Sequence, residues 1–409
     1  MEFGLIGEHL GHSFSREIHG MLCSEPYELR ELRHDELPRF LSERKFRGIN
    51  VTIPYKREVM PHLDDIADSA RACEAVNCIV NHGGKLTGYN TDYDGFIALA
   101  RHAGVDFKGA KVIILGAGGA ASAVAAAARS MGAAYVNNAC RRPAEGQLQL
   151  AAPESWSDCD IIVNATPVGM YPDWHGKLLD ISMFPNLRGV LDCIYNPLRT
   201  RLVLDAQERG ISADGGLYML VGQAIRAREL FDGSSIPADF CEKVYERILR
   251  SKRNIVLSGM PSCGKTTVGR ALASRTGRRY IDTDEVIALQ AGMEIPEIFA
   301  REGEAGFRKR ETAAIESVAC EQGVIIATGG GAILKDENVR LLRHNGIICL
   351  LQRDLELLVP TNDRPLSRDR AALQALYDRR FPCYLQAAEV TIDNNGTLEN
   401  TLAELDKLC

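Results

Sequence analysis

The segment Asn254–Thr267 restricts the possible folds of this chain more than any other part of the sequence. It reads Asn-Ile-Val-Leu-Ser-Gly-Met-Pro-Ser-Cys-Gly-Lys-Thr-Thr, an apolar strand, a glycine-bounded loop and the start of a helix. The spacing fits G-x-x-x-x-G-K-[ST], in which backbone N–H groups and the lysine hold phosphate and the hydroxyl binds Mg²⁺. A glycine-rich turn with an incidental lysine is the alternative. The pattern predicts nucleotide contacts at Gly259, Cys263, Gly264, Lys265, Thr266 and Thr267, but leaves the phosphate acceptor open.

Length and charge limit what surrounds this loop. The chain has 409 residues, which suggests two or three domains, and its 45% hydrophobic and 25% charged content is typical of a soluble globular protein. The net charge of -6 argues against a broad nucleic-acid-binding face, which needs clustered Lys and Arg. We therefore expect small anionic ligands held by local positive groups.

Cysteine usage and hydropathy favour a cytoplasmic protein. The twelve cysteines include no C-x-x-C pair, so reduced thiols are expected. The first residues show no basic region followed by an apolar core, so no secretory signal is predicted. The uncharged stretch Val112–Ala128 is shorter than a membrane span of about 20 residues, and Gly-Ala-Gly-Gly divides it into a strand, a turn and a helix. No membrane partner is predicted.

The rhythm of apolar strands and polar helices predicts an α/β fold with three domains. Residues 1–95 alternate strands with helices in a βαβ pattern, which predicts a largely parallel sheet. Residues 96–215 repeat the rhythm, and the helices at 216–250 are expected to pack back onto the first domain. The charged run at 250–253 is predicted to be a solvated linker rather than a binding patch. Residues 254–409 would form a P-loop domain like that of nucleoside-monophosphate kinases.

A second glycine motif predicts a Rossmann-like domain within residues 96–215. The strand from Lys111 runs into Gly116-Ala117-Gly118-Gly119-Ala120-Ala121, which fits G-x-G-x-x-A at the start of a helix. Glycines there allow the backbone to approach a pyrophosphate. The next strand is followed by Arg141 and Arg142, where an NAD site places an acid for the ribose hydroxyl. Arginines suit a 2′-phosphate, so NADP is favoured; two surface arginines are the alternative.

Six further clusters accompany this motif. They are Gly11-His-Ser-Phe-Ser15, Asn50-Val-Thr-Ile-Pro-Tyr-Lys56, Glu74-Ala-Val-Asn77, Gly88-Tyr-Asn-Thr-Asp92, Asn164-Ala-Thr-Pro-Val-Gly-Met170 and Gly216-Leu-Tyr-Met-Leu-Val-Gly-Gln223. In this order, residues 1 to 250 closely resemble shikimate dehydrogenase. The resemblance implies that residues 1–95 form the substrate domain and residues 96–215 the NADP domain.

The same resemblance implies the residues of a first active site. Lys56 and Asp92 would be the catalytic pair, with Asp92 orienting the ammonium group and Lys56 supplying a proton while hydride reaches carbon. Without the resemblance, the two could be an ordinary ion pair. The remaining expected contacts are Ser13 and Ser15 to the substrate carboxylate, Thr52, Asn77, Asp92, Tyr195 and Gln223 to ring hydroxyls, and Gly216 and Met219 to the cofactor.

Two carboxylates follow the phosphate loop in Tyr280-Ile-Asp-Thr-Asp284. Strand alternation would place Asp282 and Asp284 on one face of the strand end. Asp282, together with the Thr266 hydroxyl, is predicted to serve Mg²⁺, and Asp284 a substrate hydroxyl. A helix N-cap formed by Asp284 is the alternative, and the two roles are compatible.

Residues 254–409 resemble shikimate kinase. The series that carries the resemblance is the phosphate loop, Asp282-x-Asp284, Phe307-Arg308, Gly329-Gly-Gly331, Arg364-Pro-Leu366 and Arg380-x-Pro-x-Tyr384. It implies that Asp284 orients the attacking hydroxyl, Arg308 and Arg380 bind the carboxylate, and Gly330 and its neighbours meet the substrate. Lys265 and Arg364 would stabilise the transferring phosphoryl group. The usual arginine before the Arg-Pro-Leu motif is missing, which leaves the adenine contacts open.

These predictions combine into one bifunctional cytoplasmic enzyme. The first half would reduce 3-dehydroshikimate with NADPH, and the second would phosphorylate shikimate with ATP and Mg²⁺. Three alternatives stay open: an NAD-dependent quinate or shikimate dehydrogenase in the first half, a non-catalytic module attached to an active kinase, and a kinase half that only senses or hydrolyses ATP.

Overall fold

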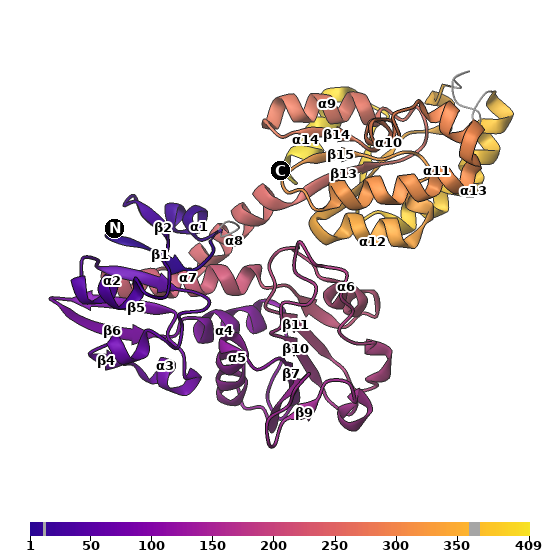
Figure 1. Cartoon of the computed structure of the whole chain (residues 1–409). Helices are drawn as coiled ribbons and strands as arrows, with labels where there is room; N and C mark the ends of the chain where they lie inside the picture. Colours follow the sequence, from indigo (N-terminus) through magenta and orange to yellow (C-terminus); the bar gives the residue numbers. More distant parts are fainter. Residues whose placement is uncertain (11–13, 360–368) are drawn as a thin grey trace. The chain divides into compact units, whose positions relative to one another are not determined.

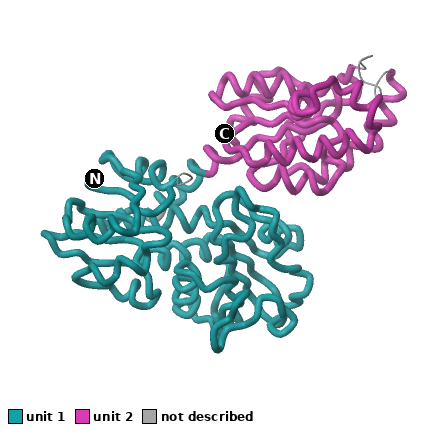
Figure 2. The backbone as a smooth tube through the Cα atoms, in the orientation of Figure 1, with its two compact units in different colours: residues 1–248 teal, residues 249–409 magenta. Residues whose placement is uncertain are grey.

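A computed structural model describes residues 1–10, 14–359 and 369–409 of the chain (Figure 1). It divides into two compact units, Met1–Ile248 and Leu249–Cys409 (Figure 2). No helix in these described ranges is long and apolar enough to cross a membrane.

The first unit begins with a six-stranded sheet in the order β2-β1-β3-β5-β6-β4. Its strands are β1 (Phe3–Gly7), β2 (Tyr27–Glu31), β3 (Gly48–Val51), β4 (Asp65–Ile66), β5 (Cys78–His82) and β6 (Lys85–Tyr89). The accompanying helices are α1 (Ser15–Leu22), α2 (Leu37–Glu43), the 3-10 turn η1 (Met60–His62) and α3 (Asp68–Cys73). Buried Ile49, Val51 and Ile79 are part of the apolar core on one face of the sheet.

This sheet is mixed, whereas the sequence predicts a largely parallel one. β1 pairs in parallel with β2 and β3, and β4 with β6, but β5 runs antiparallel to both β3 and β6. The reversal occurs at Gly83 and Gly84, which both have positive φ. A two-residue turn with two positive φ angles is the favoured connection of a β-hairpin, so the Gly-Gly pair was a usable signal.

A second, entirely parallel sheet follows, in the order β12-β11-β10-β7-β8-β9. Its strands are β7 (Lys111–Leu115), β8 (Tyr135–Cys140), β9 (Leu148–Gln149), β10 (Ile161–Asn164), β11 (Gly189–Asp192) and β12 (Ser212–Asp214). Its helices are α4 (Asp92–His102), α5 (Gly119–Ser130), η2 (Pro153–Trp156), η3 (Ile181–Met183) and α6 (Arg201–Glu208). This is the doubly wound order, in which ligands bind outside the carboxyl ends of the strands where the order reverses. Here that point lies between β7 and β10.

Three helices join the two sheets of the first unit. The boundary expected between residues 95 and 96 falls inside α4, which α7 (Leu217–Asp232) crosses closely. A Cβ on Gly95 would lie 2.5 Å from the Met219 carbonyl oxygen, so only glycine allows this approach. α8 (Ala238–Lys252) packs through Tyr245 against the rings of His102 and Tyr218, both with centroids 4.9 Å away.

The linker expected at 250–253 is the end of α8. This helix continues to Lys252, and only Arg253 separates it from β13. Arg278 donates hydrogen bonds to the carbonyl oxygens of Arg250 (2.6 Å) and Arg253 (2.9 Å), and the Gly323 N–H donates to that of Lys252 (2.9 Å). These open carbonyls at the helix end need donors, so the backbone of the charged run is fixed within the second unit, while Arg250 and Ser251 stay exposed.

The second unit contains one parallel sheet in the order β14-β15-β13-β16-β17. Helices cover both faces, with α9 and α14 on one and α11 and α12 on the other (Figure 1). The strands are β13 (Asn254–Ser258), β14 (Tyr280–Asp282), β15 (Ile325–Ala327), β16 (Gly346–Gln352) and β17 (Val390–Asp393). The helices are α9 (Lys265–Thr276), α10 (Thr283–Ala291), α11 (Ile295–Ala319, kinked at Gly303), η4 (Ala332–Leu334), α12 (Asp336–Asn345), η5 (Leu355–Leu357), α13 (Arg370–Ala387) and α14 (Leu398–Asp406). β13 and β15 are buried along their whole length, as expected of strands covered on both faces.

Candidate active sites

Lys56 and Asp92 form the centre of the first candidate site. The Lys56 ammonium group donates a hydrogen bond to Asp92 Oδ2 at 2.6 Å, and both side chains are largely removed from solvent. Asp92 is the first residue of α4, where the helix N-terminus favours a negative charge. A cation held by a single carboxylate in this way keeps two further N–H bonds for a substrate oxygen.

A buried hydrogen-bond network surrounds this pair. Asn77 Oδ1 accepts from the Thr91 N–H (2.7 Å) and hydroxyl (3.2 Å), and that hydroxyl lies 3.4 Å from Gln223 Oε1. Asn90 Oδ1 accepts from the N–H of Asp92 at 3.1 Å. The predicted substrate contacts Asn77 and Gln223 are thus brought together around the start of α4, and Thr91 is the link that the sequence did not single out.

The predicted dinucleotide loop lies beside the catalytic pair. Gly116 has φ +109°, and Gly118 precedes α5 with no atom within 4 Å of a Cβ built on it, so the backbone is open to a ligand there. A Cβ on Gly119 would lie 3.6 Å from Lys56 Cδ. A cofactor bound at this loop is therefore close to the residue expected to supply the proton. Ala117 and Ala120 lie in the same loop and first turn.

The two arginines predicted to favour NADP follow β8 directly. Arg141 and Arg142 are both exposed, next to the strand that holds the dinucleotide loop. Gly116 donates its N–H to the Ala139 carbonyl (3.0 Å), and Asn138 Nδ2 donates to the Gly116 carbonyl (2.7 Å). Asn138 was not predicted, because an amide at the end of a strand has no distinctive spacing.

The remaining predicted contacts of the first site lie around α1 and the start of α7. Ser15 begins α1 and is buried, and the preceding Phe14 packs against Tyr195 with ring centroids 5.1 Å apart. Thr52 directly follows β3 and donates its N–H to the Ile6 carbonyl at 2.9 Å. Gly216 is the N-cap of α7, and Met219 lies buried one turn later. Ser13 lies outside the described residues.

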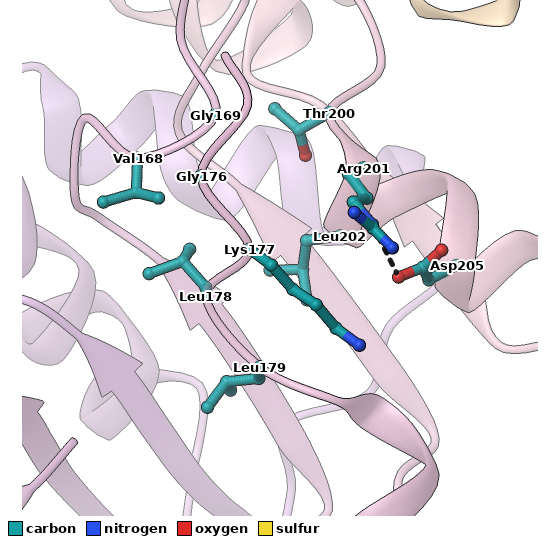
Figure 3. A pocket seen from close by; sticks show the side chains of 10 residues that line it. All are labelled: Val168, Gly169, Gly176, Lys177, Leu178, Leu179, Thr200, Arg201, Leu202 and Asp205. Carbon is teal, nitrogen blue, oxygen red and sulfur yellow. Dashed lines mark ion pairs between the residues drawn. The ribbon is translucent and has the colours of Figure 1, made fainter. Parts of the chain in front are cut away.

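A shallow pocket lies next to this site without being part of it. It is lined by Val168, Gly169, Gly176, Lys177, Leu178, Leu179, Thr200, Arg201, Leu202 and Asp205 (Figure 3). The only ion pair drawn among them joins Arg201 and Asp205 at 3.8 Å. None of the residues predicted for catalysis or binding lines this pocket, but Thr200 belongs to the loop that carries Tyr195.

The second candidate site begins at the phosphate loop after β13. Positive φ angles at Gly259 (+143°), Ser262 (+65°) and Gly264 (+99°) curl the backbone around the loop. The Lys265 ammonium group donates to the carbonyl oxygens of Gly259 (2.9 Å) and Met260 (3.0 Å), which keeps the charge over the loop. This is the concave arrangement of backbone N–H groups that binds phosphate. Cys263 is buried beneath it, and Thr266 and Thr267 are exposed in the first turn of α9.

Asp282 and Asp284 do not alternate along a strand as expected. β14 ends at Asp282, and its side chain accepts the Asp284 N–H at 3.0 Å, so Asp282 and not Asp284 is the N-cap of α10. The Tyr280 hydroxyl donates to Asp282 Oδ2 at 3.1 Å. Thr266 and Asp282 both offer oxygen atoms, the ligands that Mg²⁺ prefers. In the described ranges no three His, Cys, Asp or Glu side chains are grouped to hold a metal ion.

The glycine loop after β15 is surrounded by the predicted shikimate contacts. A Cβ on Gly331 would collide with Arg308 Nη1, and one on Gly329 would lie 2.6 Å from Asp284 Oδ1. Arg308 donates to Glu311 Oε2 at 2.8 Å. Burial raises the pKa of Glu311, nearby Asp284 adds to the effect, and Arg308 opposes it. Glycine is thus required for two charged groups to approach the same backbone.

Arg380 completes this cluster from α13. Its Nη1 donates to the Gly330 carbonyl at 3.0 Å, and the Tyr384 hydroxyl donates to the same oxygen at 2.5 Å. Arg380 is only 4% exposed, yet its Nε has no partner in the part of the chain that the structure describes. A buried guanidinium with an unused donor fits an anionic ligand. Arg364 lies outside the described residues.

Sequence reasoning missed two residues of the second site. The sequence assigns no role to Glu311, although it is 1% exposed and its Oε1 has no partner among the described residues. Asn394 lies directly after β17, donates its amide to the Cys263 carbonyl at 2.6 Å and accepts from Thr401 at 2.7 Å. It supports the phosphate loop from the far end of the domain, a contact between residues too distant along the chain for any local pattern to reveal.

Comparisons with known proteins match parts of both units of the chain. The family model "Shikimate dehydrogenase substrate binding domain" matches residues 5–79, and the model "Shikimate kinase" matches residues 261–407. A shikimate dehydrogenase (NADP(+)) of Clostridium perfringens is 34% identical over 264 residues, which cover 60% of this chain and 97% of that protein.

Solved structures resemble the same part of the chain. A chorismate mutase/shikimate 5-dehydrogenase fusion protein from Clostridium acetobutylicum superposes with a TM-score of 0.57 at 35% identity, covering 60% of this chain and 96% of that one. Shikimate 5-dehydrogenase from Thermus thermophilus, solved with NADP(H) and shikimate, gives a TM-score of 0.55 at 32% identity, covering 60% of this chain and 99% of that one.

Proposed function

The chain belongs to the shikimate dehydrogenase family and carries a shikimate kinase domain C-terminal to it, and from this premise we propose that one polypeptide reduces 3-dehydroshikimate and phosphorylates the product. The observation that carries the proposal for the first reaction is the 2.6 Å Lys56–Asp92 pair beside the dinucleotide loop. Reduction of a ketone needs hydride on carbon and a proton on oxygen.

Lys56 supplies the proton in the first reaction. Bound NADPH supplies the hydride. Asp92 holds the ammonium group in place, and the shift of a proton from Lys56 to the developing alkoxide produces the hydroxyl group. Asn77, Gln223 and Thr52 bind ring hydroxyls, and Ser15 binds the carboxylate, in both cases through neutral hydrogen bonds.

Arg141 and Arg142 bind the 2′-phosphate of the cofactor. Both are exposed at the carboxyl end of β8, and neither is an acid that could bind a free ribose hydroxyl. Guanidinium groups hold phosphate through parallel N–H donors. Gly116, Gly118 and Gly119 would hold the pyrophosphate, and Gly216 and Met219 would contact the cofactor.

The second site transfers the γ-phosphoryl group of ATP to the hydroxyl made by the first. Asp284 orients the attacking hydroxyl, while Arg308 and Arg380 hold the carboxylate, all against the Gly329–Gly331 loop. Lys265 stabilises charge on the transferred group together with Arg364. Thr266 and Asp282 would hold Mg²⁺, which neutralises phosphate charge.

The chain is a cytoplasmic enzyme under this proposal. No disulfide joins any of the twelve cysteines, all of which lie within the described ranges. Burial raises the pKa of several of them, among them Cys73 to about 12 and Cys159 to about 12. Thiols outside disulfides are typical of proteins kept in a reducing compartment.

An omission experiment tests the proposed function. Purified protein is mixed with 3-dehydroshikimate, NADPH, ATP and Mg²⁺, each component is left out in turn, and products are identified by mass. Shikimate 3-phosphate should form only in the full mixture, and shikimate should accumulate without ATP. Replacing NADPH by NADH, or shikimate by quinate in the reverse direction, distinguishes the proposed function from that of an NAD-dependent quinate or shikimate dehydrogenase.

One pair of variants identifies the catalytic lysine. Lys56→Met should reduce kcat for reduction by at least about 10³-fold because the proton donor is lost, while phosphorylation of added shikimate stays unchanged. Lys45→Met is the matched control, since Lys45 is exposed and pairs only with Glu43. Near-normal reduction by Lys56→Met would contradict the assigned role.

A further inference from the structure

A buried carboxylate lies directly behind the first site. Asp192, the last residue of β11, is 0% exposed. Its Oδ1 accepts from the Ile194 N–H at 2.9 Å, its Oδ2 accepts from the Thr200 hydroxyl at 2.7 Å, and Asn164 Nδ2 lies 3.0 Å from both oxygens. None of these donors is charged, so the protein holds a carboxylate in its interior with neutral groups alone.

Asn164 extends this arrangement into the loop after β10. Its Oδ1 accepts from the N–H (2.9 Å) and the hydroxyl (2.8 Å) of Thr166, and the Thr166 hydroxyl accepts from the Val168 N–H at 3.2 Å. A Cβ on Gly116 would lie 3.0 Å from the Ala165 carbonyl oxygen. The loop set by Asn164 thus forms the wall against which the dinucleotide turn is packed.

Ile194 and Thr200 extend the arrangement into the loop after β11. The Ile194 carbonyl accepts the Gly216 N–H at 2.7 Å, and a Cβ on Gly216 would collide with the Cys193 carbonyl oxygen. The same loop carries Tyr195, whose ring contacts Phe14 beside Ser15. The position of residues expected to touch both substrate and cofactor therefore depends on this loop.

We propose that Asp192 is a positioning residue whose carboxylate joins the loops at 165–168 and 193–200, so that the cofactor and substrate sides of the first site are held at one relative position. The proposal rests on the proposed function of that site. Two carboxylate oxygens can accept from Asn164, Ile194 and Thr200 together, whereas an amide would turn one acceptor into a donor facing other donors. A carboxylate is otherwise a poor choice for a core, because burying a charge is unfavourable.

The first variant keeps the shape and changes the acceptor. Asp192→Asn should raise the Kd for NADPH, followed by nicotinamide fluorescence, about tenfold. It should also lower kcat/KM for 3-dehydroshikimate about a hundredfold, since small displacements of positioning groups have effects of that size. Phosphorylation of added shikimate by the same chain should not change. Asp158→Asn, at an exposed carboxylate of the same domain, is the matched control and should leave both readouts unchanged.

A second pair of variants tests the role of Asp192 without touching it. Thr200→Val removes the hydroxyl that Asp192 accepts, and Thr200→Ser restores it along with the N-cap of α6. The serine variant should bind NADPH and turn over like the wild type, and the valine variant should lose both. If Asp192→Asn does not fold, the two Thr200 variants decide whether Asp192 has the positioning role.

Several outcomes would overturn the inference. Unchanged NADPH affinity and kcat/KM in a folded Asp192→Asn chain would do so, as would equal loss in the serine and valine variants. A wild-type chain that binds NADPH but does not reduce 3-dehydroshikimate would refute the proposed function instead, and the NADPH affinities of the variants would still decide the role of Asp192.

Discussion

The titration of Asp192 provides a quantitative test of its burial. Burial raises the pKa of Asp192 from 3.8 to about 6, against the lowering effects of Ile194, Thr200 and Asn164. An acid with a raised pKa in the folded state stabilises the fold fully below its unfolded pKa, and that stabilisation is lost as pH rises through the folded pKa. The total is about 3 kcal/mol. Of this, about 1.4 kcal/mol is lost between about pH 5 and about pH 7.5.

Asp192→Asn removes this titration, so the free energy of unfolding should be compared between the wild type and the variant across that range. Both tryptophans of the chain, Trp156 and Trp174, lie in the first unit, so tryptophan fluorescence in a denaturant titration follows that unit alone. The difference in the free energy of unfolding between the wild type and the variant should shift by about 1.4 kcal/mol in favour of the variant as pH rises. Taking the difference cancels all other titrating groups.

A constant difference across the range would refute the reasoning. It would mean that the four hydrogen bonds to Asp192 balance the effect of its burial and leave its pKa at an ordinary value. A shift of the opposite sign would mean that they stabilise the carboxylate beyond its state in water. Either result would leave the positioning role of Asp192 to be decided by its own test. It would also show that burial of the Asp192 carboxylate does not destabilise the fold.

Three further predictions concern single residues. Burial lowers the pKa of His19 from 6.5 to about 3, and Arg228 adds to this effect. The free energy of unfolding of the first unit should therefore fall by about 2 kcal/mol in the wild type between about pH 7.5 and about pH 5. The His19→Phe variant should not show this fall. Glu311→Gln should raise KM for shikimate about tenfold by removing the charge that holds Arg308, with reduction unchanged; an unaltered KM would count against this role. Gly331→Ala should lower kinase kcat/KM about a hundredfold, because its methyl group displaces the flexible end of Arg308, without a comparable loss of stability measured by denaturation.

Much of the fold follows from local pattern. The strand predicted from Lys111 to the dinucleotide turn coincides with β7, since short apolar runs between turn residues are strong signals of buried parallel strands. The phosphate loop and the dinucleotide turn could be identified because glycine spacing reports backbone geometry directly. The hairpin at Gly83 and Gly84 was missed although its turn residues were visible in the sequence.

What could not be predicted depends on contacts between distant residues. Asn164, Asp192 and Thr200 come from two strand ends and one helix start, and only the sheet order brings them together. The assignment of the N-cap to Asp282 instead of Asp284 depended on where β14 ends, which alternation alone does not determine. Residue type indicates what a side chain can do, and topology decides which side chains meet.

The course of α8 has a practical consequence for separating the two activities. A kinase fragment beginning at Asn254 would lack the carbonyl groups that Arg278 and Gly323 use, whereas a dehydrogenase fragment ending before residue 238 would lose Tyr245 from the rings of His102 and Tyr218. Neither cut yields two intact proteins. Stand-alone halves should therefore be made as overlapping fragments that each retain residues 238–252, so that the same fifteen-residue helix is supplied twice.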